Sequence, residues 1–180
     1  GYVTIPVEYR LIPEALYPAG LHDIKTAVRW VRKNCKKYGI DPDRIAVSGC
    51  SAGAQLATLV GVTNGSARHE GKGQWGKVSS RVQAIVSMDG IATFVSPENI
   101  ADSEDYFNKR GKLHVNATWL GGLYKDSPDN WNEASAVKWV TSESAPVCFI
   151  NSGLPRYHDG RDELRALYDG YGIYSECNEI

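Results

Sequence analysis

Short apolar runs that alternate with helical runs are the feature of this sequence that most limits its fold. Such runs occur at residues 45–48, 82–88 and 146–151, and another begins at 173–177. They are almost continuously apolar, which is typical of strands buried on both faces of a parallel sheet. The sequence therefore predicts an α/β fold, a mostly parallel sheet with helices on both faces.

The helical runs lie between these strands. From residue 21, apolar side chains recur at helical spacing with basic residues between them, which predicts an amphipathic helix ended by Tyr38-Gly39. The apolar positions of that helix are Leu21, Ile24, Val28, Val31 and Cys35. Further helices are expected from Ala52 onward and over 161–171, a first strand over 2–8, and a loop over 64–80.

The chain of 180 residues has the length of one domain, and we find no linker that would divide it. Residues 92–144 are longer and more mixed than the other connections, and we interpret them as an insertion or cap-like segment with short helices. The segment contains Trp119, Trp131 and Trp139. These side chains are expected either to pack in the core or to line an aromatic, sugar-binding wall.

The charge composition argues against several partners. Lys and Arg number 20 against 21 Asp and Glu, so the net charge is -1, and no strong sequence-independent attraction to nucleic acid or anionic membrane is expected. No apolar run approaches the roughly 18 residues of a membrane-spanning helix. The cysteines have neither zinc-site spacing nor disulfide density, so we predict small buried groups and no metal site at Cys35, Cys50, Cys148 and Cys177.

One motif carries chemistry, the run Gly49-Cys50-Ser51-Ala52-Gly53. A Gly-x-Ser-x-Gly sequence between a strand and a helix is typical of a nucleophile elbow, a strained turn that presents the serine hydroxyl at the end of the strand. We predict that Ser51 is a nucleophile. The helix that follows directs its free backbone N–H groups, notably that of Ala52, toward a developing oxyanion.

Further segments accompany this motif: Val7 to Glu14, Pro18 to Asp23, Val28 to Val31, Gly39 to Ile45, Trp119 to Gly122, Glu133 to Ser135 and Ala145-Pro146-Val147. Taken together, they resemble the α/β-hydrolase esterases and lipases related to hormone-sensitive lipase and to bacterial feruloyl and acetyl esterases. The resemblance covers nearly the whole chain. It implies the α/β-hydrolase fold, a Ser-His-Asp/Glu triad, no metal or other cofactor, and an uncharged ester substrate.

Placed on that fold, the chain is expected to be incomplete, because it begins after the family's His-Gly-Gly oxyanion loop and stops before the loop with the catalytic histidine. The histidines within it are His22, His69, His114 and His158. His158 follows the fourth strand, where this fold places its acid rather than its base. We therefore expect the base outside residues 1–180.

The acid should follow the fourth strand, in the chain order Ser, Asp/Glu, His. Here the sequence departs from the family pattern, and the candidates are Asp159 and Asp162, of which we favour Asp162. The alternative is structural: Asp159 would cap the next helix and Asp162 would support that cap from the first turn. Asp89 also ends a strand on the side where ligands bind in such sheets, so it could support the site.

These features predict a serine carboxylester hydrolase that works through an acyl-enzyme and acts on a small-molecule or polysaccharide ester, with neither nucleic-acid partner nor membrane span. Two alternatives stay open. A serine peptidase of the prolyl oligopeptidase type shares the elbow, although the Tyr9-Arg10-Leu11 segment favours the esterase. The second alternative is a non-catalytic binding protein on the same scaffold. It stays open because the loop that should carry the triad acid departs from the family pattern.

Overall fold

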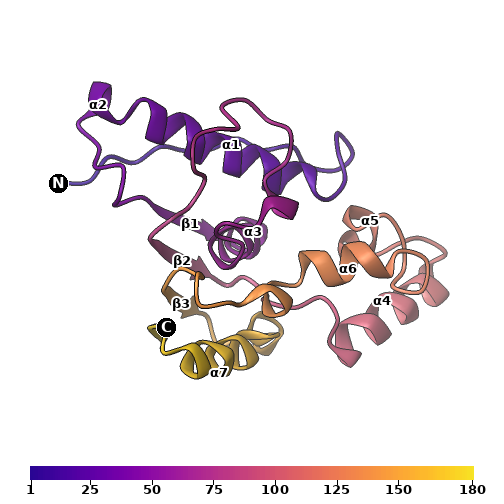
Figure 1. The fold of residues 1–180 in the computed structure, drawn as a ribbon. Helices are drawn as coiled ribbons and strands as arrows, with labels where there is room; N and C mark the ends of the chain where they lie inside the picture. Colours follow the sequence, from indigo (N-terminus) through magenta and orange to yellow (C-terminus); the bar gives the residue numbers. More distant parts are fainter.

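A computed structural model describes all residues 1–180 and contains one four-stranded parallel sheet (Figure 1). The strands are β1 (Ala46–Cys50), β2 (Ala84–Met88), β3 (Val147–Asn151) and β4 (Ser175–Glu179). They lie in the order β1-β2-β3-β4, so each strand pairs with the one before it in the chain. The four later apolar runs are therefore confirmed as strands, and the α/β class with them.

The register brings the ends of the strands together at one edge. Cys50 at the end of β1 pairs with Met88 at the end of β2, and Met88 pairs with Ile150 of β3. Because parallel strands share their direction, the residues that follow β1, β2 and β3 all emerge at this carboxyl edge. Ser51 and Asp89 are the first residues beyond β1 and β2.

Helix α1 (Ala19–Lys33) matches the predicted amphipathic run, and its Leu21 side chain is fully buried. The predicted end at Tyr38 is wrong for this helix. The Asn34 side chain donates to the Trp30 carbonyl at 2.8 Å and interrupts the run. A separate short helix, α2 (Cys35–Tyr38), follows and ends at Gly39 with a φ of 65°.

Helices α3 (Ala52–Val62) and α7 (Arg161–Tyr171) connect successive strands, and α7 has the predicted bounds. The short 3-10 helix η2 (Ala136–Trp139) contacts both of them, so α3 and α7 lie on the same face of the sheet. Helix α3 approaches β2 closely, because a Cβ on Gly61 would lie 2.3 Å from the Ile85 side chain.

The opposite face of the sheet differs from the expectation of helices on both faces. In β1 the side chains of Ala46, Ser48 and Cys50 are all exposed, whereas Ile85 and Ser87 of β2, which point to α3, are buried. The alternation follows from the pleat, since successive side chains point to opposite faces. Within residues 1–180 the helices that contact the sheet lie on one face (Figure 1).

The predicted first strand over residues 2–8 is wrong. These residues form no strand, and Tyr2 is completely exposed. A β-rich sequence becomes a strand only when its backbone groups pair with a neighbour, and no strand of residues 1–180 pairs with this segment.

The segment between β2 and β3 forms helices, as its composition indicates, although the first of them, with 14 residues, is longer than predicted. They are α4 (Pro97–Arg110), α5 (Val115–Trp119), α6 (Pro128–Ala134) and η2. Trp131 is fully buried and its indole donates to the Gly122 carbonyl at 3.0 Å, so this tryptophan packs in the core and lines no wall. A cap-like role for the segment stays a prediction.

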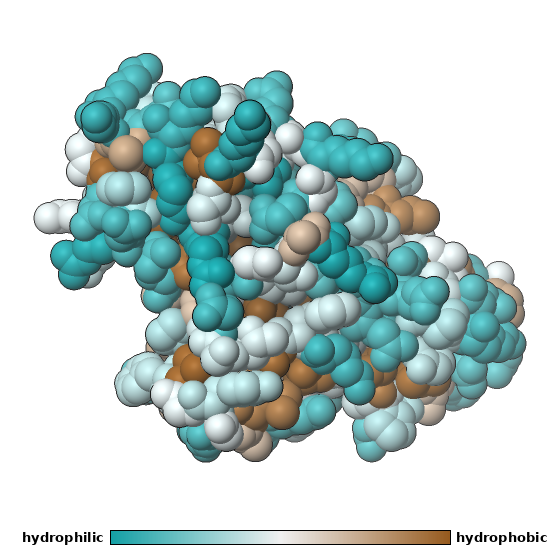
Figure 2. Space-filling model, in the orientation of Figure 1, coloured by the Kyte–Doolittle hydropathy of each residue, from teal (hydrophilic) through white to brown (hydrophobic).

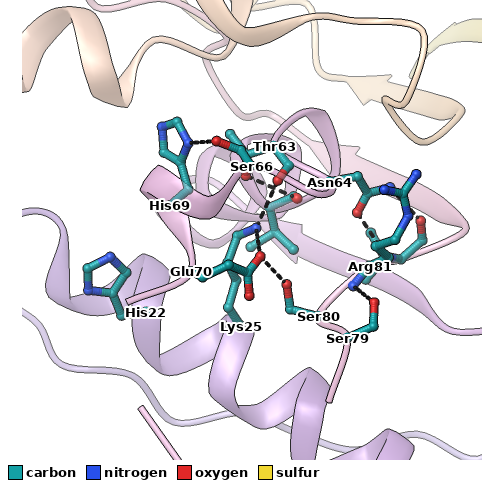
Figure 3. A network of polar contacts seen from close by, with 12 residues as sticks. His22, Lys25, Thr63, Asn64, Ser66, His69, Glu70, Ser79, Ser80 and Arg81 are labelled. Atoms are coloured by element: carbon teal, nitrogen blue, oxygen red, sulfur yellow. Dashed lines mark hydrogen bonds and ion pairs between the residues drawn. The ribbon is translucent and has the colours of Figure 1, made fainter. Parts of the chain in front are cut away.

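The connection between α3 and β2, predicted as a loop, contains the 3-10 helix η1 (Ala67–His69) and is held against α1 by buried polar contacts (Figure 3). The fully buried Lys25 donates to the Thr63 carbonyl at 3.0 Å and to Glu70 at 3.1 Å. Glu70 also accepts from Arg29 at 2.8 Å and from Ser80 at 2.6 Å. One carboxylate therefore compensates two buried cations.

The prediction that all four cysteines are buried is wrong. All four are free thiols; Cys50 is exposed, and the other three, Cys35, Cys148 and Cys177, are partly exposed. Cys50 and Cys148 lie on strands, where their side chains point to the face that no helix of residues 1–180 covers.

Hydrophilic residues dominate the face drawn in Figure 2, and the apolar ones gather in small separate groups. No helix is both long and apolar enough to cross a membrane.

Candidate active site

Ser51 lies in a sharp turn between β1 and α3. Its backbone has φ 54° and ψ -119°, a left-handed conformation that side chains other than glycine adopt at a cost on the order of 1 kcal/mol or more. The Ser51 N–H donates to the Met88 carbonyl at 2.8 Å, and the residue is exposed. The turn therefore presents the hydroxyl to solvent at the carboxyl edge of the sheet, the geometry expected of a nucleophile elbow.

The two glycines of the motif differ in whether a side chain would fit at their positions. A Cβ on Gly49 would lie 2.3 Å from the backbone carbon and oxygen of Gly53, which no side chain tolerates. A Cβ on Gly53 would meet only the Tyr9 hydroxyl, at 3.9 Å. Gly49 is thus the residue that lets the end of β1 pack against the first turn of α3.

Ala52 is the first residue of α3 and is exposed. The N–H groups of the first helical turn have no carbonyl partner within the helix, and the helix dipole makes this end partially positive. The Ser51 carbonyl accepts from Ala54 and Gln55, both at 3.0 Å. The Ala52 N–H is therefore available next to the hydroxyl, where an oxyanion donor is needed.

Asp162, the favoured acid, lies in the first turn of α7 with 70% of its side chain exposed. Its two oxygens accept from Arg161 Nε at 2.9 Å and Nη2 at 3.3 Å. The hydrogen bond from Arg161 lowers the pKa of this carboxyl. The carboxylate is thus engaged by a guanidinium from its own helix.

Asp159, the second candidate acid, does not cap α7, because the residue in that position is Gly160 and no side chain caps the helix. Its Oδ2 accepts instead from Asn99 of α4 at 2.9 Å. Burial raises the pKa of Asp159, and the nearby acids Glu98 and Asp102 raise it further. The side chain therefore ties the β3–α7 loop to helix α4.

No hydrogen bond joins a histidine of residues 1–180 to Ser51. His69 is buried, and its Nδ1 lies 2.7 Å from Ser66 Oγ (Figure 3). Burial lowers the pKa of His69 to about 4, so it is neutral at pH 7. His158 Nε2 lies 4.0 Å from Glu179. The prediction that the base lies outside this stretch is untested and stays a prediction.

Sequence reasoning missed the buried polar group at the end of β3. The fully buried Asn151 donates from Nδ2 to Asp89 at 3.5 Å and to the Tyr157 carbonyl at 3.3 Å. Arg161 donates to Asn151 at 3.4 Å and to Glu179 at 3.0 Å. The available signal was an amide at the end of an apolar strand, which must find partners when buried.

A cavity of about 640 Å³ is lined mostly by polar residues of the N-terminal segment, of α1 and of the loop before β2, and Ser51 does not line it. Its acidic and basic groups include Arg10 and Asp23, which are paired at 2.7 Å. Tyr9, which lines this cavity, also places its hydroxyl 3.9 Å from the Cβ position of Gly53, so the cavity borders the elbow without including Ser51.

Comparisons with known proteins agree with this geometry. Among curated proteins of Mycobacterium tuberculosis, the chain is 38% identical to esterase LipC over 151 residues, which are 84% of this chain and 36% of LipC. It is 34% identical to the probable carboxylic ester hydrolase LipM over 184 aligned positions, which are 100% of this chain and 38% of LipM. The chain thus spans little more than a third of the length of these relatives.

Among solved structures, a truncated form of a carbohydrate esterase from gut microbiota superposes with a TM-score of 0.77 at 25% identity, over 96% of this chain and 63% of that one. The esterase 2 of Thermogutta terrifontis superposes with a TM-score of 0.71 at 18% identity, over 96% and 58%. The second likeness bears on the fold alone. The BD-FAE family matches residues 1–154. The elbow, the parallel sheet and this match together show that the chain belongs to the BD-FAE family of α/β-hydrolase esterases.

Proposed function

We propose that the protein is a serine carboxylester hydrolase with Ser51 as its nucleophile. The observation that supports this most directly is the left-handed backbone of Ser51 between strand β1 and helix α3, with the residue exposed. Strain of this kind is maintained by the surrounding structure and concentrates at functional sites. The esterases among the relatives support the same reaction class.

The proposed reaction has two halves. Ser51 Oγ attacks the ester carbonyl carbon while its proton passes to a histidine base, and the carbonyl oxygen, now an oxyanion, accepts from the Ala52 N–H. The tetrahedral intermediate expels the alcohol, which takes the proton from the imidazolium. Water then attacks the acyl-enzyme with the same base and releases the carboxylic acid.

The substrate is proposed to be an acylated carbohydrate or another small uncharged ester. The carbohydrate esterase from gut microbiota, which superposes over nearly the whole chain, supports this choice. The exposed Ser51 at an open sheet edge is also compatible with a bulky alcohol such as a polysaccharide.

The test uses the protein expressed from its complete reading frame. A fluorophosphonate probe should label Ser51, identified by peptide mass spectrometry, and Ser51→Ala should lower p-nitrophenyl acetate hydrolysis by about 10⁴-fold or more. Cys50→Ala is the matched control, since it changes the neighbouring residue and should retain labelling. Near-normal turnover by Ser51→Ala would show that the elbow serine is not the nucleophile. A wild-type protein that neither reacts with the probe nor hydrolyses the ester would favour the binding-protein alternative.

A further inference from the structure

Asp89 occupies a position next to the elbow that the reaction described so far does not use. It directly follows Met88, the residue whose carbonyl accepts the Ser51 N–H at 2.8 Å. Its own N–H donates to the Ile150 carbonyl at 3.0 Å. The backbone of Asp89 is thus fixed between β1 and β3, at the same edge as Ser51 and one strand away.

The carboxylate of Asp89 is held on one side only. Oδ1 accepts from the Ser152 N–H at 2.8 Å and from Asn151 Nδ2 at 3.5 Å. No hydrogen bond reaches Oδ2. Burial opposes ionisation of this carboxyl, but the hydrogen bonds from Ser152 and Asn151 outweigh it and keep its pKa below the usual value. An oriented, ionised carboxylate with one free oxygen is what an imidazole N–H needs as its acceptor.

The turn that carries Asp89 is strained and tightly packed. Asp89 has a φ of 54°, outside the range that side chains prefer. A Cβ on the next residue, Gly90, would lie 2.5 Å from the Ala54 side chain and 2.7 Å from the Gln55 nitrogen. The turn after β2 is therefore pressed against the first turn of α3, which fixes Asp89 relative to Ser51.

The two acids of the β3–α7 loop are less suited to the same task. Both oxygens of Asp162 accept from Arg161, and that guanidinium would repel an imidazolium. Asp159 is bonded to Asn99, and its raised pKa makes it a weaker partner for a cation. Asp89 has no cationic side chain bonded to it.

We propose that Asp89, rather than Asp162 or Asp159, is the positioning acid of the catalytic histidine. The inference rests on the proposed function, in which Ser51 is the nucleophile. When the base takes the Ser51 proton on one ring nitrogen, the N–H of the other donates to Asp89 Oδ2. Asp89 stays ionised and stabilises the imidazolium, and the proton leaves with the alcohol.

The test compares Asp89→Asn with Asp159→Asn and Asp162→Asn in the protein expressed from its complete reading frame. Asparagine keeps an oxygen for the Ser152 N–H and tolerates a left-handed backbone well, so Asp89→Asn removes mainly the charge. We expect kcat for p-nitrophenyl acetate to fall by about 10³- to 10⁴-fold with KM within a few-fold, while the two controls stay within about tenfold of wild type.

The pH profile supplies a readout that a structural role would not move. Without the anionic neighbour, the pKa of the histidine falls, so the acid limb of kcat/KM should shift to lower pH in Asp89→Asn. An additional variant, Asp89→Gly, relieves the backbone strain, and formate should restore its kcat by about tenfold or more because it replaces the missing carboxylate. Formate should have no effect on Ser51→Ala.

Contrary outcomes separate the two proposals. Asp89 is not the acid if Asp89→Asn turns over within tenfold of wild type, or if the large loss occurs only in Asp162→Asn or Asp159→Asn. In either case the esterase proposal stands as long as Ser51→Ala is inactive. If Ser51→Ala is active, the proposed function itself fails. If circular dichroism shows that Asp89→Asn is unfolded, the response of Asp89→Gly to formate decides whether Asp89 is the acid. The assignment is then overturned if formate fails to restore kcat.

Discussion

Ser51 and Asp89 share a left-handed backbone with a φ of 54°, although neither is a glycine. Each follows the last residue of its strand, and those last residues, Cys50 and Met88, are paired in the sheet. The hydrogen bond from the Ser51 N–H to the Met88 carbonyl links the two turns. A hydroxyl and a carboxylate are thereby held one strand apart by backbone that resists rearrangement.

The glycines of the elbow should differ in their tolerance to alanine. Gly49→Ala forces a Cβ into the Gly53 backbone, so the free energy of unfolding should fall by about 2 to 3 kcal/mol. Gly53→Ala meets only the Tyr9 hydroxyl at 3.9 Å and should change stability by less than about 1 kcal/mol. Urea denaturation of both variants measures the difference, and equal losses would contradict the packing described.

Glu70→Gln should destabilise the fold strongly. It leaves Lys25 and Arg29, both buried, without their shared carboxylate, and removing one partner of a buried ion pair costs about 3 kcal/mol. Asp105→Asn in α4 is the control, because it breaks only the exposed pair with Lys109 and should cost less than about 0.5 kcal/mol. Thermal and urea unfolding would refute the prediction if the two variants were equally stable.

Acid should destabilise the protein through His69. Its pKa is about 4 in the folded protein against an ordinary 6.5, so between these values the unfolded chain binds more protons. The free energy of unfolding should therefore fall as the pH drops, by about 2 kcal/mol from pH 7.5 to pH 5 on account of this residue. His69→Gln should flatten that part of the curve, and an unchanged slope would assign the effect to other groups.

An isolated chain of residues 1–180 should show no measurable ester turnover. No histidine in it is hydrogen-bonded to Ser51, and a serine hydroxyl without a base is a poor nucleophile at neutral pH. The comparison is p-nitrophenyl acetate hydrolysis by this chain and by the product of the complete reading frame. Turnover by the isolated chain at ordinary enzyme rates would make His158 the base to test.

The sheet and the elbow could be predicted from the sequence because their signals are local. An apolar run such as 146–151 can be recognised without knowing its partner strand. Gly49 within its motif likewise indicates that another part of the backbone, here Gly53, approaches closely. The strand predicted over residues 2–8 was wrong because its formation depends on distant residues. Its strand propensity is real, but pairing depends on a neighbour that the local sequence cannot reveal.

The choice of acid could not be settled from sequence because it depends on which partners reach each carboxylate. Asp162 is bonded to the adjacent Arg161, yet Asp159 is bonded to Asn99, which lies 60 positions earlier in the chain. Asp89 is oriented by Ser152, which follows the end of the neighbouring strand β3 and lies 63 positions later in the chain. Contacts of this range arise only when the strands assemble, so spacing alone gives no sign of them.

The order of the strands has a consequence for biosynthesis. Because β1, β2, β3 and β4 pair in the sequence in which they occur, a chain that emerges from the ribosome can add each strand to an edge already formed. The turn at Ser51 closes when β2 arrives, since its N–H then finds the Met88 carbonyl. The elbow can therefore be completed early, while the later strands are still being translated.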